Sequence, residues 1–229
     1  MTCDKCNGTT WIFRKDEKGN EFVTPCECRE KIIAINLMKA SGISEEDTKK
    51  GFAGFNTFNE SALIMAKDKA TSYFNNFSAI EGERVNSIML CGSSGRGKTT
   101  LGLAIANNLI STGVGVRYMP YRDVVTRLKQ LLASNDNKHL YDETIYRLKN
   151  AKVLFIDDLL KGKINETDIN IMYEIINHRY LQHKPCIVST EKTIQQLLEF
   201  DEAIGSRLIE MSKGYIITFD NSVPNYRLR

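Results

Sequence analysis

The chain has 229 residues, of which 42% are hydrophobic and 26% charged, with 15 glycines and 4 prolines. This composition is typical of a folded globular protein and argues against disordered, collagen-like or linker-dominated chains. The formal net charge of +3 neither requires nor excludes a nucleic-acid partner. No apolar run approaches the roughly 20 residues that span a bilayer, and no export signal is recognisable, so we expect a cytoplasmic protein without a membrane partner.

The first cysteines of the chain form two short pairs. Cys3-x2-Cys6 and Cys26-x-Cys28 are separated by 19 residues, which is the spacing of a structural zinc site. Between the pairs, apolar runs flank a Gly19-Asn20 turn signal, so we expect a small hairpin. A segment this short cannot bury a sufficient core, and a bound metal supplies the missing stability. We therefore predict a closed Zn²⁺ site of four thiolates, the alternative being adventitious thiols.

The rest of the chain alternates between two hydrophobic periodicities. A helix is expected over 31–40, followed by a connector that contains three phenylalanines between residues 51 and 58. Further helices are expected over 62–77, 99–110, 121–132, 168–180 and 193–200, and strands over 87–91, 114–119, 153–156, 186–189 and 215–219. This order predicts an α/β fold with a parallel sheet flanked by helices. We divide the chain into a zinc-binding segment (1–40), a connector (41–60) and a nucleotide-binding domain (61–229).

A glycine-rich loop follows the strand expected over 87–91. It matches G-x4-G-K-[ST] at every fixed position and opens the next helix, which makes it a P-loop. Its glycines allow main-chain N–H groups to surround phosphate oxygens. Lys98 is expected to reach the β- and γ-phosphates of ATP, and the Thr99 hydroxyl to bind Mg²⁺. The predicted nucleotide-binding residues are Gly92, Ser93, Ser94, Gly95, Arg96, Gly97, Lys98, Thr99 and Thr100.

Two aspartates end the apolar run over 153–156. Carboxylates at this end of a parallel strand face the ligand crevice, so Asp157 is predicted to hold Mg²⁺. Asp158 stands where many ATPases carry the glutamate that activates water. Because aspartate is one methylene shorter, we hypothesise that intrinsic hydrolysis is slow and depends on assembly or a partner.

These motifs together resemble the bacterial and phage replicative helicase loaders of the DnaC/DnaI type, AAA+ ATPases related to the IstB transposition helpers. The resemblance extends over the cysteine cluster, the connector, the P-loop, the aspartate pair and the segments 187–191, 204–208 and 225–228. It implies an AAA+ (ASCE) ATPase that binds a hexameric replicative helicase through segment 1–40 and delivers it to single-stranded DNA.

The resemblance also implies roles for single residues. Arg207 matches the arginine finger, which acts across an interface between copies of the chain, and Ser189-Thr190 matches the sensor 1 position, with Thr190 as the catalytic residue. Glu191 follows where many relatives have asparagine. Only 22 residues follow Arg207, too few for the C-terminal helical lid of most AAA+ proteins.

A basic region is the expected contact with single-stranded DNA. Residues 114–152 carry eight basic and four acidic side chains, and Arg122 and Lys129 share a helix face. The resemblance places Arg122, Arg127 and Lys129 on the DNA backbone, with Tyr118 or Tyr121 available for stacking. The alternative is an ordinary solvated helix face.

Three other functions remain open from the sequence. An IstB-like transposition helper has the same fold, but the cysteine cluster argues against it. A P-loop small-molecule kinase with structural zinc would need an acceptor pocket and no arginine finger in trans. A non-enzymatic adaptor would bind nucleotide without hydrolysing it.

Overall fold

The computed structural model describes residues 3–133, 135–219, 223 and 225–228. Its centre is a five-stranded parallel sheet in the order β4-β5-β6-β3-β7. The strands are β3 (Ile88–Gly92), β4 (Val116–Pro120), β5 (Val153–Leu159), β6 (Cys186–Thr190) and β7 (Ile216–Phe219). The strands β3, β5 and β6 are almost entirely buried, which explains their continuous apolar sequences. The predicted α/β fold with a parallel sheet is confirmed.

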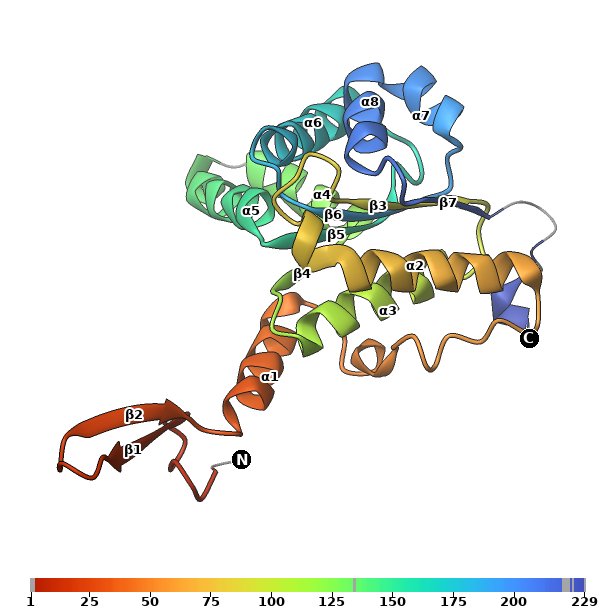
Figure 1. The fold of residues 1–229 in the computed structure, drawn as a ribbon. Helices are drawn as coiled ribbons and strands as arrows, with labels where there is room; N and C mark the ends of the chain where they lie inside the picture. Colours follow the sequence, from red (N-terminus) through yellow and green to blue (C-terminus); the bar gives the residue numbers. More distant parts are fainter. Residues whose placement is uncertain (1–2, 134, 220–222, 224, 229) are drawn as a thin grey trace.

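Helices cover both faces of this sheet (Figure 1). One face packs against α2 (Ser61–Ile80) and α3 (Lys98–Ser111). The other carries α4 (Tyr121–Leu132), α5 (Lys138–Asn150), α6 (Glu166–Leu181), α7 (Ile194–Phe200) and α8 (Glu202–Met211). Alternate side chains of one strand enter the two cores: Phe155 joins the first, and Leu154 and Ile156 join the second.

The helices α5 and α8 are absent from the sequence-based prediction. In α5 only Ile145 and Leu148 are buried, so its apolar periodicity is weak. The helix α8 begins at Glu202, directly after α7, and the side chain of its N-cap residue Asp201 accepts from the amide of Ile204. The described elements that follow α8 are β7 and the short 3-10 helix η3 (Tyr226–Leu228).

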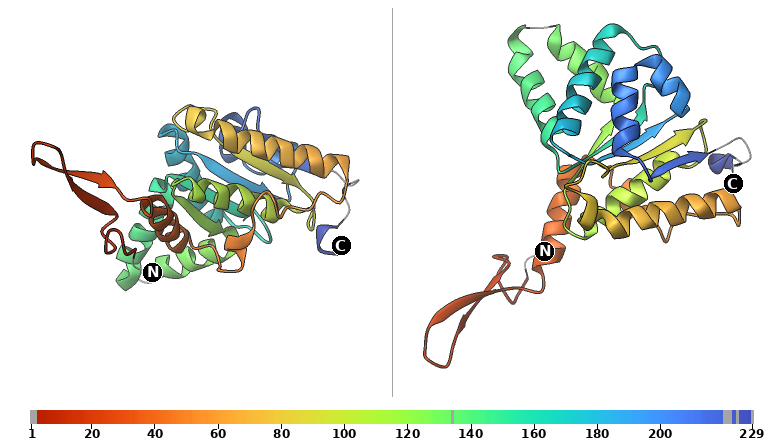
Figure 2. Two further views of the ribbon diagram at one scale, coloured as in Figure 1. Left: turned by 60° about the horizontal axis from the view of Figure 1, so that its bottom comes forward. Right: turned by 45° about the horizontal axis from the view of Figure 1, so that its top comes forward.

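The N-terminal hairpin extends away from the sheet (Figures 1 and 2). It consists of β1 (Trp11–Lys15) and β2 (Glu21–Pro25), which pair antiparallel across the predicted turn. The helix α1 (Arg29–Ser41) leads from the hairpin to the sheet and ends at Gly42, in the left-handed conformation with φ 81°. Leu37 and Met38 pack against the first core, so the end of α1 is anchored while the hairpin projects.

The phenylalanine-rich connector lies along the nucleotide-binding part of the chain. It contains the 3-10 helix η1 (Asp47–Lys49). Phe55 is buried, and the ring of Phe52 lies 5.9 Å from that of Phe74 in α2. The division into residues 1–40, 41–60 and 61–229 stays a prediction. Within the described residues, no helix is long and apolar enough to cross a bilayer.

Candidate functional site

The P-loop joins β3 to α3 and has the backbone of a phosphate cradle. Gly95 and Gly97 have φ of 75° and 86°, a region in which a side chain would be strained. The amides of the first turn of α3 point toward the same place, where the positive end of the helix dipole favours an anion. The loop therefore fits a triphosphate through its own main chain.

Lys98, Thr99 and Asp157 meet beneath this loop. The Lys98 ammonium donates to the Ser93 carbonyl at 2.9 Å, and the Thr99 hydroxyl donates to Asp157 Oδ1 at 2.9 Å. Burial lowers the pKa of Lys98, while the carboxylates of Asp158 and Glu191 oppose this effect. A hydroxyl beside a carboxylate is the hard-oxygen donor pair that Mg²⁺ prefers, so the residues present fit the predicted metal.

Asp157 is held by donors from two neighbouring strands. The Ser189 hydroxyl in β6 donates to Asp157 Oδ1, and the Tyr118 hydroxyl in β4 donates to Asp157 Oδ2 at 3.0 Å. Burial raises the pKa of Asp157, and the hydrogen bonds from Ser189 and Thr99 counteract the rise. The three strands thus fix one carboxylate at the carboxyl edge of the sheet.

The expectation that Thr190 is the catalytic group of sensor 1 is not what the geometry favours. Its buried hydroxyl donates to the Leu159 carbonyl at 3.0 Å and accepts from the Lys192 amide, so it bonds main chain. The preceding Ser189 instead contacts Asp157 and accepts from the Asp158 amide at 2.8 Å. Side chains alternate along a strand, and only one of two adjacent residues can face the aspartates. The sequence named the pair, but the facing residue depends on the orientation of β6.

Asp158 lies on a bulge of β5 and faces the P-loop hollow. Its Oδ2 accepts from the Lys161 ammonium at 2.8 Å, and the same ammonium lies 3.0 Å from Glu191 Oε1. The hydrogen bond to Asp158 is the main reason why the pKa of Lys161 is raised. Neither Lys161 nor its partnership with Asp158 was predicted from the sequence, because both depend on how the chain turns after β5.

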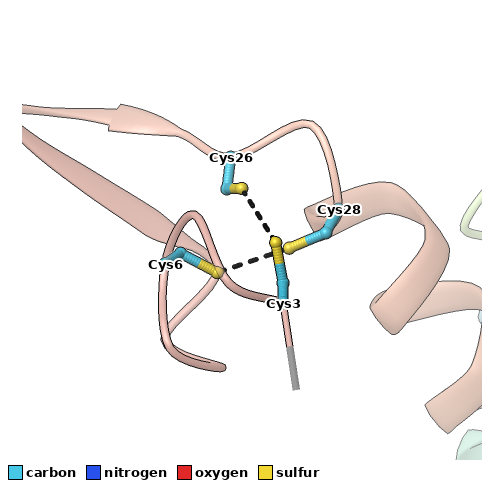
Figure 3. Close-up of side chains that lie close together, drawn as sticks. All are labelled: Cys3, Cys6, Cys26 and Cys28. Carbon is cyan, nitrogen blue, oxygen red and sulfur yellow. Dashed lines mark hydrogen bonds between the residues drawn. The ribbon is translucent and has the colours of Figure 1, made fainter. Parts of the chain in front are cut away.

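The four N-terminal cysteines converge (Figure 3). Their sulfur atoms all lie within 4.8 Å of one another, with Cys3–Cys26 at 3.8 Å and Cys6–Cys28 at 3.4 Å. All four are free thiols. Sulfurs around a tetrahedral zinc ion, with Zn–S of about 2.3 Å, are about 3.8 Å apart. The predicted donor set is thus brought together at separations compatible with a bound Zn²⁺ ion.

Arg207 lies in α8 and packs on α6 of its own chain. Its Nε donates to Asn177 Oδ1 at 3.1 Å, and its guanidinium carbon lies 5.3 Å from the centre of the Tyr173 ring. A further bond at 2.6 Å runs from its NH1 to the Ala203 carbonyl. In this arrangement the arginine is held by neighbouring side chains, so action on a second copy would require it to leave them.

The predicted DNA-contacting residues have different surroundings. Arg122 and Arg127 are exposed on α4, and in the described part of the chain neither makes an ion pair. Lys129 is bonded at 2.6 Å to the buried Asp168 of α6, so it also fastens α4 to α6. The suggestion that Tyr118 or Tyr121 stacks on DNA bases is wrong. Tyr121 is buried, and Tyr118 lies against Phe155 with its hydroxyl on Asp157. The Tyr121 ring lies inside the fold, and the partly buried Tyr118 ring packs against the core.

The C-terminal segment lies against the P-loop. The Tyr226 amide donates to the Gly95 carbonyl at 2.6 Å, and the Tyr226 ring stacks on Phe55 at 5.3 Å. The Tyr226 hydroxyl accepts from the amide of Asn56 at 3.0 Å. The connector and the C-terminal segment therefore form one wall beside the phosphate-binding loop.

Comparison with known proteins identifies close and distant relatives. The family model of the IstB-like ATP binding proteins matches residues 55–210. The chain is 42% identical to the uncharacterized protein YqaM of Bacillus subtilis over 94% of this chain and 70% of YqaM. It is 38% identical to the phage-like element PBSX protein XkdC of Bacillus subtilis, over 93% of this chain and 81% of XkdC.

Solved structures share the fold at lower identity. A crystal structure of DnaI superposes with a TM-score of 0.62 at 22% identity, covering 81% of this chain and 95% of DnaI. A crystal structure of the DnaC helicase loader gives a TM-score of 0.58 at 21% identity, covering 77% of this chain and 99% of DnaC. These likenesses establish a P-loop AAA+ fold of the DnaC/DnaI kind.

Proposed function

The chain belongs to the family of IstB-like ATP-binding proteins, P-loop ATPases, and we propose that it is an ATP-dependent loader of a hexameric replicative helicase onto single-stranded DNA. The fold shared with the DnaC helicase loader supports this proposal. The observation that carries it is the cysteine hairpin, which projects away from the sheet (Figure 1) and which we interpret as a second binding module.

The hairpin presents exposed apolar side chains. Residues directly opposite in β1 and β2 share a face, which places Phe13 beside Val23, with Trp11 two residues along. Phe13 is 76% exposed and Val23 48% exposed. Exposed aromatic and aliphatic side chains on a two-stranded hairpin are typical of a protein-binding surface. We infer that this face binds the helicase and that Zn²⁺ on the four cysteines holds the hairpin in shape.

The ATPase site uses the residues beneath the P-loop. Bound ATP would supply the transferable phosphoryl group, and bound Mg²⁺ would neutralise the charge that develops on it. Lys98 would bind the phosphate chain, and Thr99 and Asp157 would hold Mg²⁺. Ser189 orients Asp157. We propose that Asp158 accepts a proton from the attacking water and that Arg207 of one copy completes the site of the next.

Single-stranded DNA is the proposed second ligand. The exposed guanidinium groups of Arg122 and Arg127 can contact successive phosphates without breaking an ion pair first. Contacts of this kind follow the backbone and weaken steeply with salt. We propose that DNA binding and helicase release are coupled through nucleotide state.

The second candidate is an IstB-like transposition helper. The name of the matching family favours it, but the family match begins at residue 55 and leaves the cysteine hairpin outside. We therefore take the hairpin as the feature that favours a loader, because it is an additional module, outside the matched ATPase core, that could bind a helicase.

A loading assay tests the proposal. The replicative helicase of the same organism is mixed with single-stranded DNA circles, and DNA-bound helicase is measured with and without this protein and ATP·Mg²⁺. We expect loading to rise with the wild-type protein and to fall to background with Lys98→Ala. Equal loading with and without the protein would contradict a loader function.

A further inference from the structure

A basic hollow lies directly beside the nucleotide site. It has a volume of about 330 Å³ and lies between α4 and the loop that follows β5. Arg122 and Lys129 of α4 line one side, and Lys161 and Lys163 of the loop line the other. Asp168, which also lines it, is paired with Lys129. Lys161 has carboxylate partners of its own, and the two other cations, Arg122 and Lys163, leave the hollow with a net positive charge that suits an anionic ligand.

Lys161 belongs to this hollow and to the ATPase site at once. Its ammonium bonds Asp158 at 2.8 Å and Glu191 at 3.0 Å, and its side chain is 36% exposed. An anion entering the hollow can therefore reach the ammonium that neutralises Asp158. Because an ammonium is a compact charge on a flexible stem, it can exchange one anionic partner for another.

The backbone around Asp158 is strained. Asp158 and Leu160 have φ of 57° and 59°, and the pairing of β5 with β6 shifts register between Ile156 and Leu159. Non-glycine residues stay in this region only where their surroundings hold them. The ion pair between Asp158 and Lys161 spans this turn, so its loss would leave the Asp158 side chain free to change position.

We propose that the hollow binds a phosphate of a single-stranded nucleic-acid backbone, and that this phosphate draws Lys161 away from Asp158. The strand thereby frees the Asp158 carboxylate for the water beside the P-loop, which couples DNA binding to hydrolysis. This inference rests on the proposed function for the identity of the ligand. It adds Lys163 as a contact to the phosphate backbone of the DNA and Lys161 as the residue that positions the Asp158 carboxylate.

Binding without nucleotide gives the first test. Because the coupling is reciprocal, removing the charge of Asp158 must strengthen the hold of Lys161 on DNA. We expect Asp158→Asn to raise the affinity for a fluorescent oligothymidylate about two- to fivefold, the range of an exposed ion pair. Lys161→Met is expected to weaken binding and to reduce the slope of log K against log salt by about 0.7.

The double variant tests whether Asp158 affects DNA affinity through Lys161, the relay proposed here, or only through its negative charge. In the Lys161→Met background, Asp158→Asn is expected to give no further gain in DNA affinity. An equal gain with and without Lys161 would overturn the relay, because the carboxylate would then act on DNA through space.

The ATPase rate gives the second test. Wild type is expected to be stimulated by the oligonucleotide, whereas Lys161→Met has a basal kcat raised about two- to fivefold and little further stimulation. Lys161→Arg keeps a cation and is expected to restore stimulation. The charge-matched control is Lys213→Ala, an exposed lysine after α8, which is expected to behave as wild type.

The outcomes distinguish this inference from the proposed function. Wild type that does not bind the oligonucleotide overturns both the proposed DNA contact and the relay. Wild type that binds and is stimulated, together with Lys161→Met that is stimulated to the same degree, overturns the relay alone.

Discussion

The hydroxyl of Ser189 donates to the carboxylate of Asp157 and accepts from the amide of Asp158. One side chain of β6 thus fixes both acidic residues of β5. Ser189→Ala removes this support and leaves buried polar groups with fewer partners. We expect a loss of stability of about 1–3 kcal/mol and a kcat lowered at least about tenfold.

The neighbouring Thr190 supplies the comparison for this prediction. Its hydroxyl bonds the main chain at Leu159. Thr190→Val should therefore cost stability while lowering kcat less than Ser189→Ala does. A larger loss of kcat in Thr190→Val would restore Thr190 as the sensor residue.

Asp157 is expected to make stability depend on pH. Burial raises its pKa above the ordinary 3.8, so the native state keeps its proton to a higher pH than the unfolded state does. Stability therefore falls as the pH rises through this window, and the cost of the ionised carboxylate persists at neutral pH.

Asp157→Asn removes that cost. We expect the melting temperature of the nucleotide-free protein at neutral pH to rise, with the gain shrinking toward pH 4. Stabilisation by ATP·Mg²⁺ is expected to be lost. Differential scanning calorimetry with the exposed Asp123→Asn as control checks this, and a lower melting temperature at neutral pH would argue against it.

The sequence predicted the fold well where patterns are local. The helix expected over 121–132 has those bounds, because Val125 and Leu128 recur at helical spacing above buried strands. The aspartates were found for the same reason, since an apolar strand ends in them.

Contacts between distant strands could not be predicted in this way. Ser189 meets Asp157 only because β6 lies beside β5 and the Ser189 side chain is on the face toward Asp157. Lys161 meets Asp158 because the chain turns sharply at a bulge. Tyr118 and Tyr121 were misjudged because aromatic residues in a basic region can equally well fill the core.

Removal of the metal should affect one end of the molecule. Because Cys6 and Cys26 are the only buried side chains within residues 3–28, stripping zinc with a chelator, or Cys26→Ser, is expected to unfold residues 3–28 and to leave the sheet intact. Two-dimensional NMR would show the hairpin resonances collapse alone. Cys28→His keeps a zinc ligand and is expected to preserve them; a hairpin that stays folded after metal removal would contradict this role.

Arg207 can be tested by mixing two inactive variants. Arg207→Ala has an intact P-loop, and Lys98→Ala has an intact arginine. If the finger acts between copies, each alone is expected to lose at least about 10³-fold in kcat, and the mixture is expected to recover activity at mixed interfaces. No recovery over a range of ratios would exclude action in trans.

The most direct test of the loader is complex formation with the helicase. Size-exclusion chromatography with light scattering follows this protein mixed with the replicative helicase of the same organism, with and without ATP·Mg²⁺. Phe13→Ser changes the apolar face of the hairpin, and Arg14→Ser, on the opposite face of the same strand, is the matched control. We predict a stable complex for wild type and Arg14→Ser that is lost in Phe13→Ser. No complex in any nucleotide state, or equal binding by Phe13→Ser, would contradict the proposed helicase contact.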